Sequence, residues 1–129
     1  MLFGTILLSS ALLANGMTDN RVAEARYQDV LENQCEEVLG FAEGTEAHMD
    51  CQLFYEKLFR RLYGISDSMS LSAVQRVEQK IEQLNTACQK HYGDKDIPAA
   101  ALWRCIQKQG ELERDEKTYQ DKRYDRRRH

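Results

Sequence analysis

The sequence predicts an all-α protein, a small helical bundle built from two helical hairpins that are each closed by a disulfide. Three observations lead to this prediction. The 129 residues include one proline and seven glycines, and 30% of them are charged, a composition that favours helices over strands. Apolar residues recur at intervals of three and four, the period of a helix with one buried face. The four cysteines form two matched pairs.

The matched pairs are Cys35 with Cys51 and Cys88 with Cys105. In each pair the leading cysteine is followed five positions later by a glycine, Gly40 or Gly93. The chain therefore repeats one unit, a helix, a short loop and a second helix, with a cysteine on either side of the loop. Disulfides persist in oxidising compartments, so the pattern predicts a periplasmic or secreted protein.

The first sixteen residues carry no charge. Residues 2–13 have the character of the apolar centre of a secretory signal, and small residues precede a cleavage point before Met17. No lysine or arginine precedes the apolar run, so an upstream start, an atypical leader and an amphipathic first helix remain alternatives. Lipidation is not expected, because position 17 is not a cysteine. The predicted domains are a signal peptide at 1–16, a helical domain at 17–112 and a charged extension at 113–129.

The first predicted hairpin extends from Thr18 or Asn20 to Gly64. Its first helix ends near Leu39, before Gly40, and Thr45 is predicted to cap its second helix. The predicted buried face of the first helix comprises Tyr27, Val30, Leu31, Gln34, Cys35 and Val38. That of the second comprises Cys51, Tyr55, Leu58 and Leu62.

In the second predicted hairpin, the third helix has the clearest pattern in the chain. Its apolar positions are Val74, Val77, Ile81, Leu84 and Cys88. Ser72 with Gln75 offers a capping box at its start, and Gly93 ends it. Pro98 suits the first turn of a fourth helix. The buried side of that helix is predicted to hold Leu102, Trp103, Cys105, Ile106 and Leu112.

Beyond Leu112 the apolar period stops, and residues 113–129 are mostly charged. A solvated helical extension and a frayed tail are the two alternatives. The basic end, Lys122-Arg123 and Arg126-Arg127-Arg128, could bind an anionic envelope surface. Because six acidic residues nearly balance seven basic ones over 111–129, a solvated tail is the preferred interpretation.

The predicted disulfides are Cys35–Cys51 and Cys88–Cys105. Each pair straddles one short loop and closes with little chain search, and each cysteine lies ~8–9 Å from its turn. Links between the hairpins would need the first and third helices, or the second and fourth, to touch across the diagonal of the bundle. Cα atoms more than ~7 Å apart cannot be bridged without backbone movement, and diagonal helices normally exceed that distance. Disulfides between the hairpins are therefore not expected.

A metal site is the alternative use of the cysteines. His48 and His91 each lie three residues from a cysteine on a shared helical face, which permits a Cys/His or methionine-assisted copper site. However, neither pair has the short spacing of zinc sites and no C-x-x-C is present. We therefore expect no metal and no cofactor. Motifs for hydrolysis or phosphate binding are also missing from the sequence, so we expect no enzyme.

A contact surface for another protein is predicted on the second helix. The aromatic cluster of this helix is wider than one stripe, and the candidates for the rim of the core are Phe54, Phe59 and Arg61. Aromatic and arginine side chains at such a rim contribute strongly to binding. The preferred interpretation of these residues is nevertheless that they complete the core. A net charge of −3 does not favour a nucleic-acid partner.

The segment from Cys35 to Cys51, CEEVLGFAEGTEAHMDC, resembles a motif of small exported bacterial envelope proteins and lipoproteins of unassigned function. The resemblance rests on Cys35, Gly40, Phe41, Gly44, Thr45 and Cys51 and covers roughly residues 31–58. Glu43 stands where that motif often has proline. The second hairpin matches only at Cys88, Gly93 and Cys105. The resemblance implies an exported helical protein and brings no reaction or substrate with it.

Together these features predict a non-enzymatic protein of the bacterial envelope that acts by contacts with another envelope protein. One alternative is an immunity or exclusion factor in the periplasm. The other is a metal-binding or redox protein that uses the four cysteines with His48 and His91.

Overall fold

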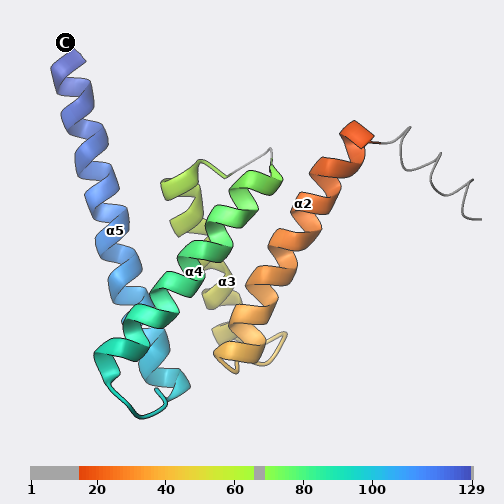
Figure 1. Cartoon of the computed structure of the whole chain (residues 1–129), viewed down its shortest axis with the longest axis vertical. Coiled ribbons are helices and arrows are strands. Elements are labelled where there is room, and N and C mark those ends of the chain that lie inside the picture. The colour runs from red at the N-terminus through yellow and green to blue at the C-terminus, as the bar shows by residue number, and fades with distance from the viewer. Residues whose placement is uncertain (1–14, 66–68, 129) are drawn as a thin grey trace, which may run out of the picture.

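The structure, a computed structural model, describes residues 15–65 and 69–128. Its elements are α2 (Asn15–Glu32), the π-helix η1 (Asn33–Val38), α3 (Glu46–Tyr63), α4 (Leu71–Tyr92) and α5 (Ala99–Arg128). Every element in these two ranges is helical (Figure 1). The predicted all-α fold of two disulfide-closed hairpins is confirmed. Most of the predicted signal peptide, residues 1–14, lies outside the described residues.

The two disulfides join the predicted partners. Cys35 is bonded to Cys51 and Cys88 to Cys105, with Cα atoms 6.0 and 5.9 Å apart. The first closes η1 onto the start of α3, and the second closes the end of α4 onto the start of α5. Three of the four cysteines are buried, and Cys105 is half-buried.

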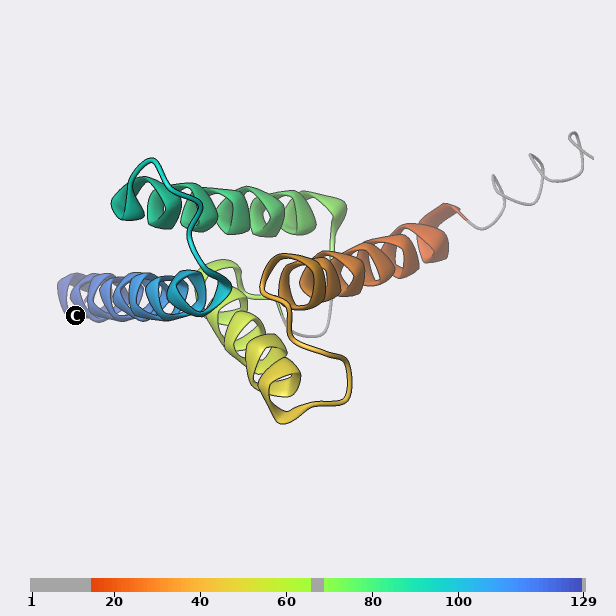
Figure 2. The same cartoon turned by 90° about the horizontal axis from the view of Figure 1, so that it is seen from below.

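The order of the helices around the bundle differs from the prediction. Seen from below, α4 and α3 lie on opposite sides, with α2 and α5 between them (Figure 2). The first helix therefore packs along the third and the second along the fourth, where the prediction had these pairs on the diagonals. Salt bridges and hydrogen bonds join them: Arg26 bonds to Glu78, and Arg61 bonds to Thr118. The predicted sulfur pairing holds because it depends on each local hairpin and not on this order.

The π-helix changes which side of the first helix faces inward. Leu39 N donates to Gln34 O at 3.0 Å, one residue further than in an α-helix. The wider turn moves the inward position from Val38 to Leu39, so that Leu39 is 2% exposed and Val38 is 40% exposed. The prediction that Val38 lies on the buried face is therefore wrong, whereas Tyr27, Leu31 and Gln34 are buried as predicted.

The helix ends follow local side-chain chemistry. Thr45 caps α3, its hydroxyl accepting from His48 N, and Gly64 ends α3 with a φ of 65° that favours glycine. The cap of α4 is Ser70 and not Ser72. Ser70 has extended backbone and its Oγ accepts from Ala73 N at 3.1 Å, whereas Ser72 already lies within the first turn.

The fourth predicted helix continues through the expected boundary at residue 112. α5 extends to Arg128 and its end projects beyond the other helices (Figure 1). Of the two alternatives for residues 113–129, the described part is thus a helical extension. Leu112 is 55% exposed, so its predicted burial is wrong. The inward position near it belongs to Gly110, which is buried against Phe54.

The core lies between the four helices. All five predicted apolar positions of α4 are buried. At the centre, α3 and α5 meet through aromatic rings: Phe54 makes edge contacts with Tyr55 and Trp103, and Tyr55 stacks on Phe59. Tight aromatic packing at this point holds the two hairpins together.

Candidate functional site

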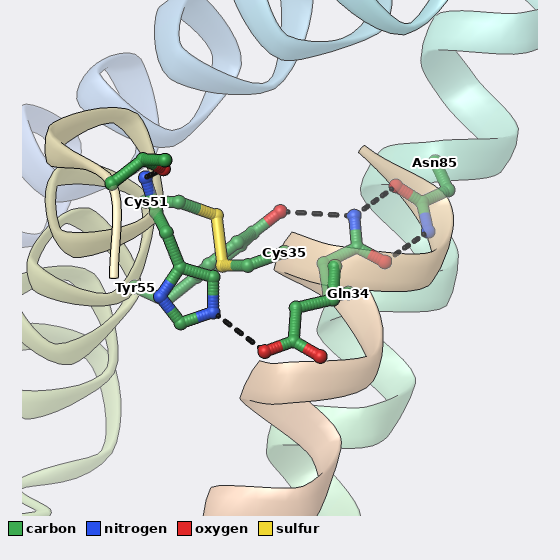
Figure 3. Close-up of a disulfide and its surroundings, with 8 residues drawn as sticks. Gln34, Cys35, Cys51, Tyr55 and Asn85 are labelled. Carbon is green, nitrogen blue, oxygen red and sulfur yellow. Dashed lines mark hydrogen bonds and ion pairs between the residues drawn. A yellow bond between two sulfur atoms is a disulfide. The ribbon is translucent and has the colours of Figure 1, made fainter. Parts of the chain in front are cut away.

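A buried polar cluster lies where η1, α3 and α4 meet (Figure 3). Gln34 Nε2 donates to Asn85 Oδ1 at 2.8 Å, and Asn85 Nδ2 donates back to Gln34 Oε1 at 3.0 Å. Gln34 Nε2 also donates to Tyr55 Oη at 3.0 Å. Since an amide nitrogen carries two hydrogens, Gln34 uses both donors and one acceptor site in these bonds. The buried amide therefore satisfies its donors, and it joins three elements.

Burial affects the third member of this cluster. It raises the pKa of the Tyr55 hydroxyl well above its usual value, although the hydrogen bond from Gln34 acts in the opposite direction. Tyr55 therefore remains neutral at physiological pH and serves as a hydrogen-bond partner. Nothing in this cluster supplies a group that gains or loses a proton near neutral pH.

The first disulfide holds this cluster against a histidine. Cys35 follows Gln34 in η1, and its partner Cys51 lies one turn after His48 in α3 (Figure 3). His48 is buried, and its Nε2 lies 3.1 Å from Glu36 Oε1, although the two atoms are not aligned as a hydrogen bond. The contact can become an ion pair when the ring is protonated. Together, these contacts fix the orientation of η1 on α3.

A groove of about 530 Å³ runs between α2–η1 and α4, directly beside Gln34 and Asn85. From Arg26 to Val38 it is ~18 Å long at 1.5 Å per residue. Its apolar lining consists of Val30, Val38 and Ile81. Val38 is turned into this groove by the π-helix, since in a regular α-helix the predicted pattern would point it inward.

The polar rim of the groove is mainly acidic. Arg26 bonds to Glu78 through both Nε, at 2.7 Å, and Nη2, at 3.3 Å. Asp29 and Glu82 complete the charged lining, and neither forms a salt bridge with another described residue. One guanidinium therefore faces three carboxylates, and the groove carries a net negative charge.

The predicted contact residues of α3 lie elsewhere and are occupied within the chain. Phe59 is fully buried, stacked between Tyr55 and Tyr63; it completes the core, as the preferred interpretation had it, and does not lie at the rim. Phe54 is half-buried and packs on Trp103. Arg61 bonds to Thr118 and Asp121 of α5. Contact of Phe54 or Arg61 with a partner protein stays a prediction.

The residues of the metal alternative are not brought together. All four sulfurs are in disulfides, so the cysteines offer no thiolate in this oxidised chain. His48 is buried beside Glu36, whereas His91 is exposed in the last turn of α4. Within residues 15–65 and 69–128, no group of three or more histidine, cysteine or acidic side chains has a geometry that could hold a metal ion.

The groove was missed by the sequence analysis, because Val38 fitted the buried face and the packing of α2 on α4 was not foreseen. Of the three groove carboxylates, only Asp29 belongs to the first hairpin, and Glu78 and Glu82 come from α4. No local acidic run therefore marks the groove in the sequence.

Comparisons with known proteins found no similar protein. No protein-family model matches the chain, and neither a curated protein nor a solved structure matches it. Among the helices of the described ranges, none combines the length and the apolar character needed to cross a bilayer.

Proposed function

We propose that this chain is an exported, non-enzymatic protein of the bacterial cell envelope, periplasmic or secreted, which acts by binding another envelope protein in the groove between α2–η1 and α4. The observation that carries the proposal is the groove itself, with Val38 turned outward beside Val30 and Ile81. The two disulfides support export, since such bonds persist in oxidising compartments.

The groove fits a particular kind of partner segment. Two parallel helices form a shallow channel about three turns long, suited to a helix laid along it with its apolar side down. Asp29, Glu78 and Glu82 favour a segment that also carries lysine or arginine. The wall of the groove formed by η1 is held rigid by the Cys35–Cys51 disulfide and by the Gln34–Asn85 amide pair. A rigid wall favours binding of the partner, because less conformational entropy is lost.

Site-directed photocrosslinking in cells tests the groove. A photoreactive amino acid at position 38 should yield a specific crosslinked protein. The matched control is position 53 on α3, where Leu53 is similarly exposed but lies outside the groove. Crosslinking of the same protein from both positions, or from position 53 alone, would contradict the proposed site.

Charge reversal tests the partner chemistry once a partner is captured. Glu82→Lys should weaken the binding of that partner at least tenfold, because Glu82 belongs to the acidic rim of the groove. Glu111→Lys makes the same charge change at an exposed site on α5 and should leave binding unchanged. Equal effects of both substitutions would indicate a response to net charge and would refute binding in the groove.

Export is tested separately by mass spectrometry of the protein from a periplasmic fraction. An intact mass reports cleavage of a leader and formation of both disulfides together. Reduced protein found only in the cytosol would refute the envelope assignment.

A further inference from the structure

The second half of α5 has two different sides. On the side toward α3, Thr118 Oγ1 accepts from Arg61 Nε at 3.0 Å, and Asp121 Oδ2 lies 3.1 Å from Arg61 Nη2. Lys117 also pairs with Asp121. The charge of Asp121 is thus neutralised by contacts with Arg61 and Lys117, whereas Asp125, one turn further on, is exposed.

The opposite side is basic and exposed. Tyr119, Lys122, Arg123 and Arg126 recur at intervals of three, one and three, so they share one helical face. All four are exposed, and the Arg123 guanidinium lies 5.8 Å from the centre of the Tyr119 ring. This set, Tyr119, Lys122, Arg123 and Arg126, is called the basic face. Asp115 and Glu116 lie further back along the helix, toward the bundle.

Among the described helices, the basic face lies on the projecting end of α5. α5 extends beyond the ends of the other helices (Figure 1), whereas the acidic groove is formed by α2, η1 and α4. The chain as a whole is negatively charged, at −3. Near an anionic surface this separation of charge turns the end of α5 toward the surface and the acidic side away from it.

We propose that the basic face of α5 binds the surface of an anionic phospholipid membrane. Arginine guanidinium groups form paired hydrogen bonds with phosphate oxygens, and a tyrosine ring suits the boundary between headgroups and acyl chains. A projecting convex helix end inserts its side chains among mobile headgroups without needing a shaped complement. The binding is peripheral and leaves the groove free for a protein partner.

A membrane fits these observations better than nucleic acid. Nucleic-acid binding draws its strength from many phosphate contacts along a track, and the basic face offers three cationic side chains at one tip. A membrane surface attracts even a small cluster, with each lysine or arginine strengthening binding about fivefold. It also provides an apolar boundary for Tyr119.

Vesicle sedimentation with the oxidised full chain tests the proposal. The probes are vesicles of phosphatidylcholine alone and vesicles with equal parts of phosphatidylglycerol. Binding is expected only to the anionic vesicles and should weaken with salt. The triple variant Lys122→Gln, Arg123→Gln, Arg126→Gln should bind about a hundredfold more weakly.

The matched control is Lys90→Gln, Lys95→Gln, Lys108→Gln, which removes the same charge from exposed sites off the basic face and should bind like the unaltered chain. Both triple variants keep the same N-terminus, so any contribution from it cancels. Circular dichroism verifies that both remain folded. Equal losses in the two variants, binding that ignores lipid charge, or no binding by the unaltered chain would overturn the proposal. Tighter binding to duplex DNA than to the anionic vesicles at the same salt concentration would also overturn it.

Discussion

At the scale of single residues, Gln34 determines how η1, α3 and α4 fit together. Its side chain is buried and bonds to both Tyr55 and Asn85. Most glutamines are exposed, and a buried amide is tolerated only when its polar atoms find partners. This cluster therefore specifies one arrangement of the three elements, since a shift of α4 along η1 would leave the amides unpaired.

The prediction for this cluster is a loss of stability with coupling between its members. Gln34→Leu should lower the free energy of unfolding by about 2–3 kcal/mol, because Tyr55 loses a partner in the interior and the half-buried Asn85 loses its reciprocal bonds. Gln34→Leu combined with Asn85→Leu should cost less than the two single substitutions added together. Urea denaturation measures both. The control Gln83→Leu, on the exposed side of α4, should change little; strictly additive losses would show that the amides do not act as a pair.

The raised pKa of Tyr27 predicts how the stability of the folded protein changes at high pH. Burial raises the pKa of its hydroxyl to about 12, with a further contribution from Glu56, whereas an unfolded chain titrates near 10. The folded state holds this proton more tightly, so its stabilising effect is complete below pH ~10 and is lost as the pH rises through about 12. Tyr27→Phe should flatten this loss in denaturation curves measured across that range. Tyr119→Phe, at an exposed tyrosine, serves as the control and should leave the curve unchanged.

At the scale of elements, Gly110 sets the distance between α3 and α5. A β-carbon at this position would lie 2.6 Å from Phe54 Cζ and 3.3 Å from Leu58 Cδ2. Phe54 cannot easily move away, because Tyr55 and Trp103 contact its ring. Glycine normally weakens a helix interior, but here it permits the close approach that encloses the aromatic core.

Gly110→Ala should therefore destabilise the protein by about 1–3 kcal/mol through overpacking, although glycine-to-alanine changes within helices usually stabilise. Phe54→Leu should reduce that cost when the two substitutions are combined, because it removes the ring that the new methyl group meets. Thermal and urea unfolding provide the measurements. Gln109→Ala, at the exposed neighbouring position, should be neutral or stabilising. A stabilising Gly110→Ala would show that α5 does not approach α3 so closely.

At the scale of the whole molecule, α5 consists of a packed half and a projecting half. Up to Glu113, α5 is held by the Cys88–Cys105 disulfide, the aromatic core and the Lys80–Glu113 ion pair. Further along, the contacts of Arg61 with Thr118 and Asp121 tie it to α3. This gradient of contacts predicts a gradient of stability along one continuous helix.

Hydrogen exchange should follow that gradient. In Arg61→Ala, amides of α5 beyond residue 118 should exchange up to about fivefold faster, the effect expected for loss of a surface ion pair and hydrogen bond. Amides near Ile106 should be unaffected, and global stability should change little. Arg60→Ala, an exposed neighbour outside the α3–α5 contact, should alter neither region. Uniform acceleration along α5 would contradict the division into two halves.

Local pattern was sufficient for much of the fold. The period of Val74, Val77 and Ile81 predicted α4 and its buried side. The repeated spacing from cysteine to glycine predicted both disulfides, because a cysteine on each side of a short loop closes with little chain search. The site was less accessible to such reasoning: the contact residues proposed on α3 are largely occupied by α5, and the groove was not foreseen.

By itself, then, the sequence determined the helices, the hairpins and the partners of the sulfurs, since these depend on residues close together in the chain. The tertiary structure alone decided that α2 lies along α4 and α3 along α5, that Phe59 lies inside, and that Val38 faces outward. Those outcomes depend on which surfaces pack together from distant parts of the chain, and on a π-turn of one extra residue that helical periodicity does not reveal. The groove lies between two helices of different hairpins, which the reciprocal amides of Gln34 and Asn85 and the Arg26–Glu78 pair join side by side.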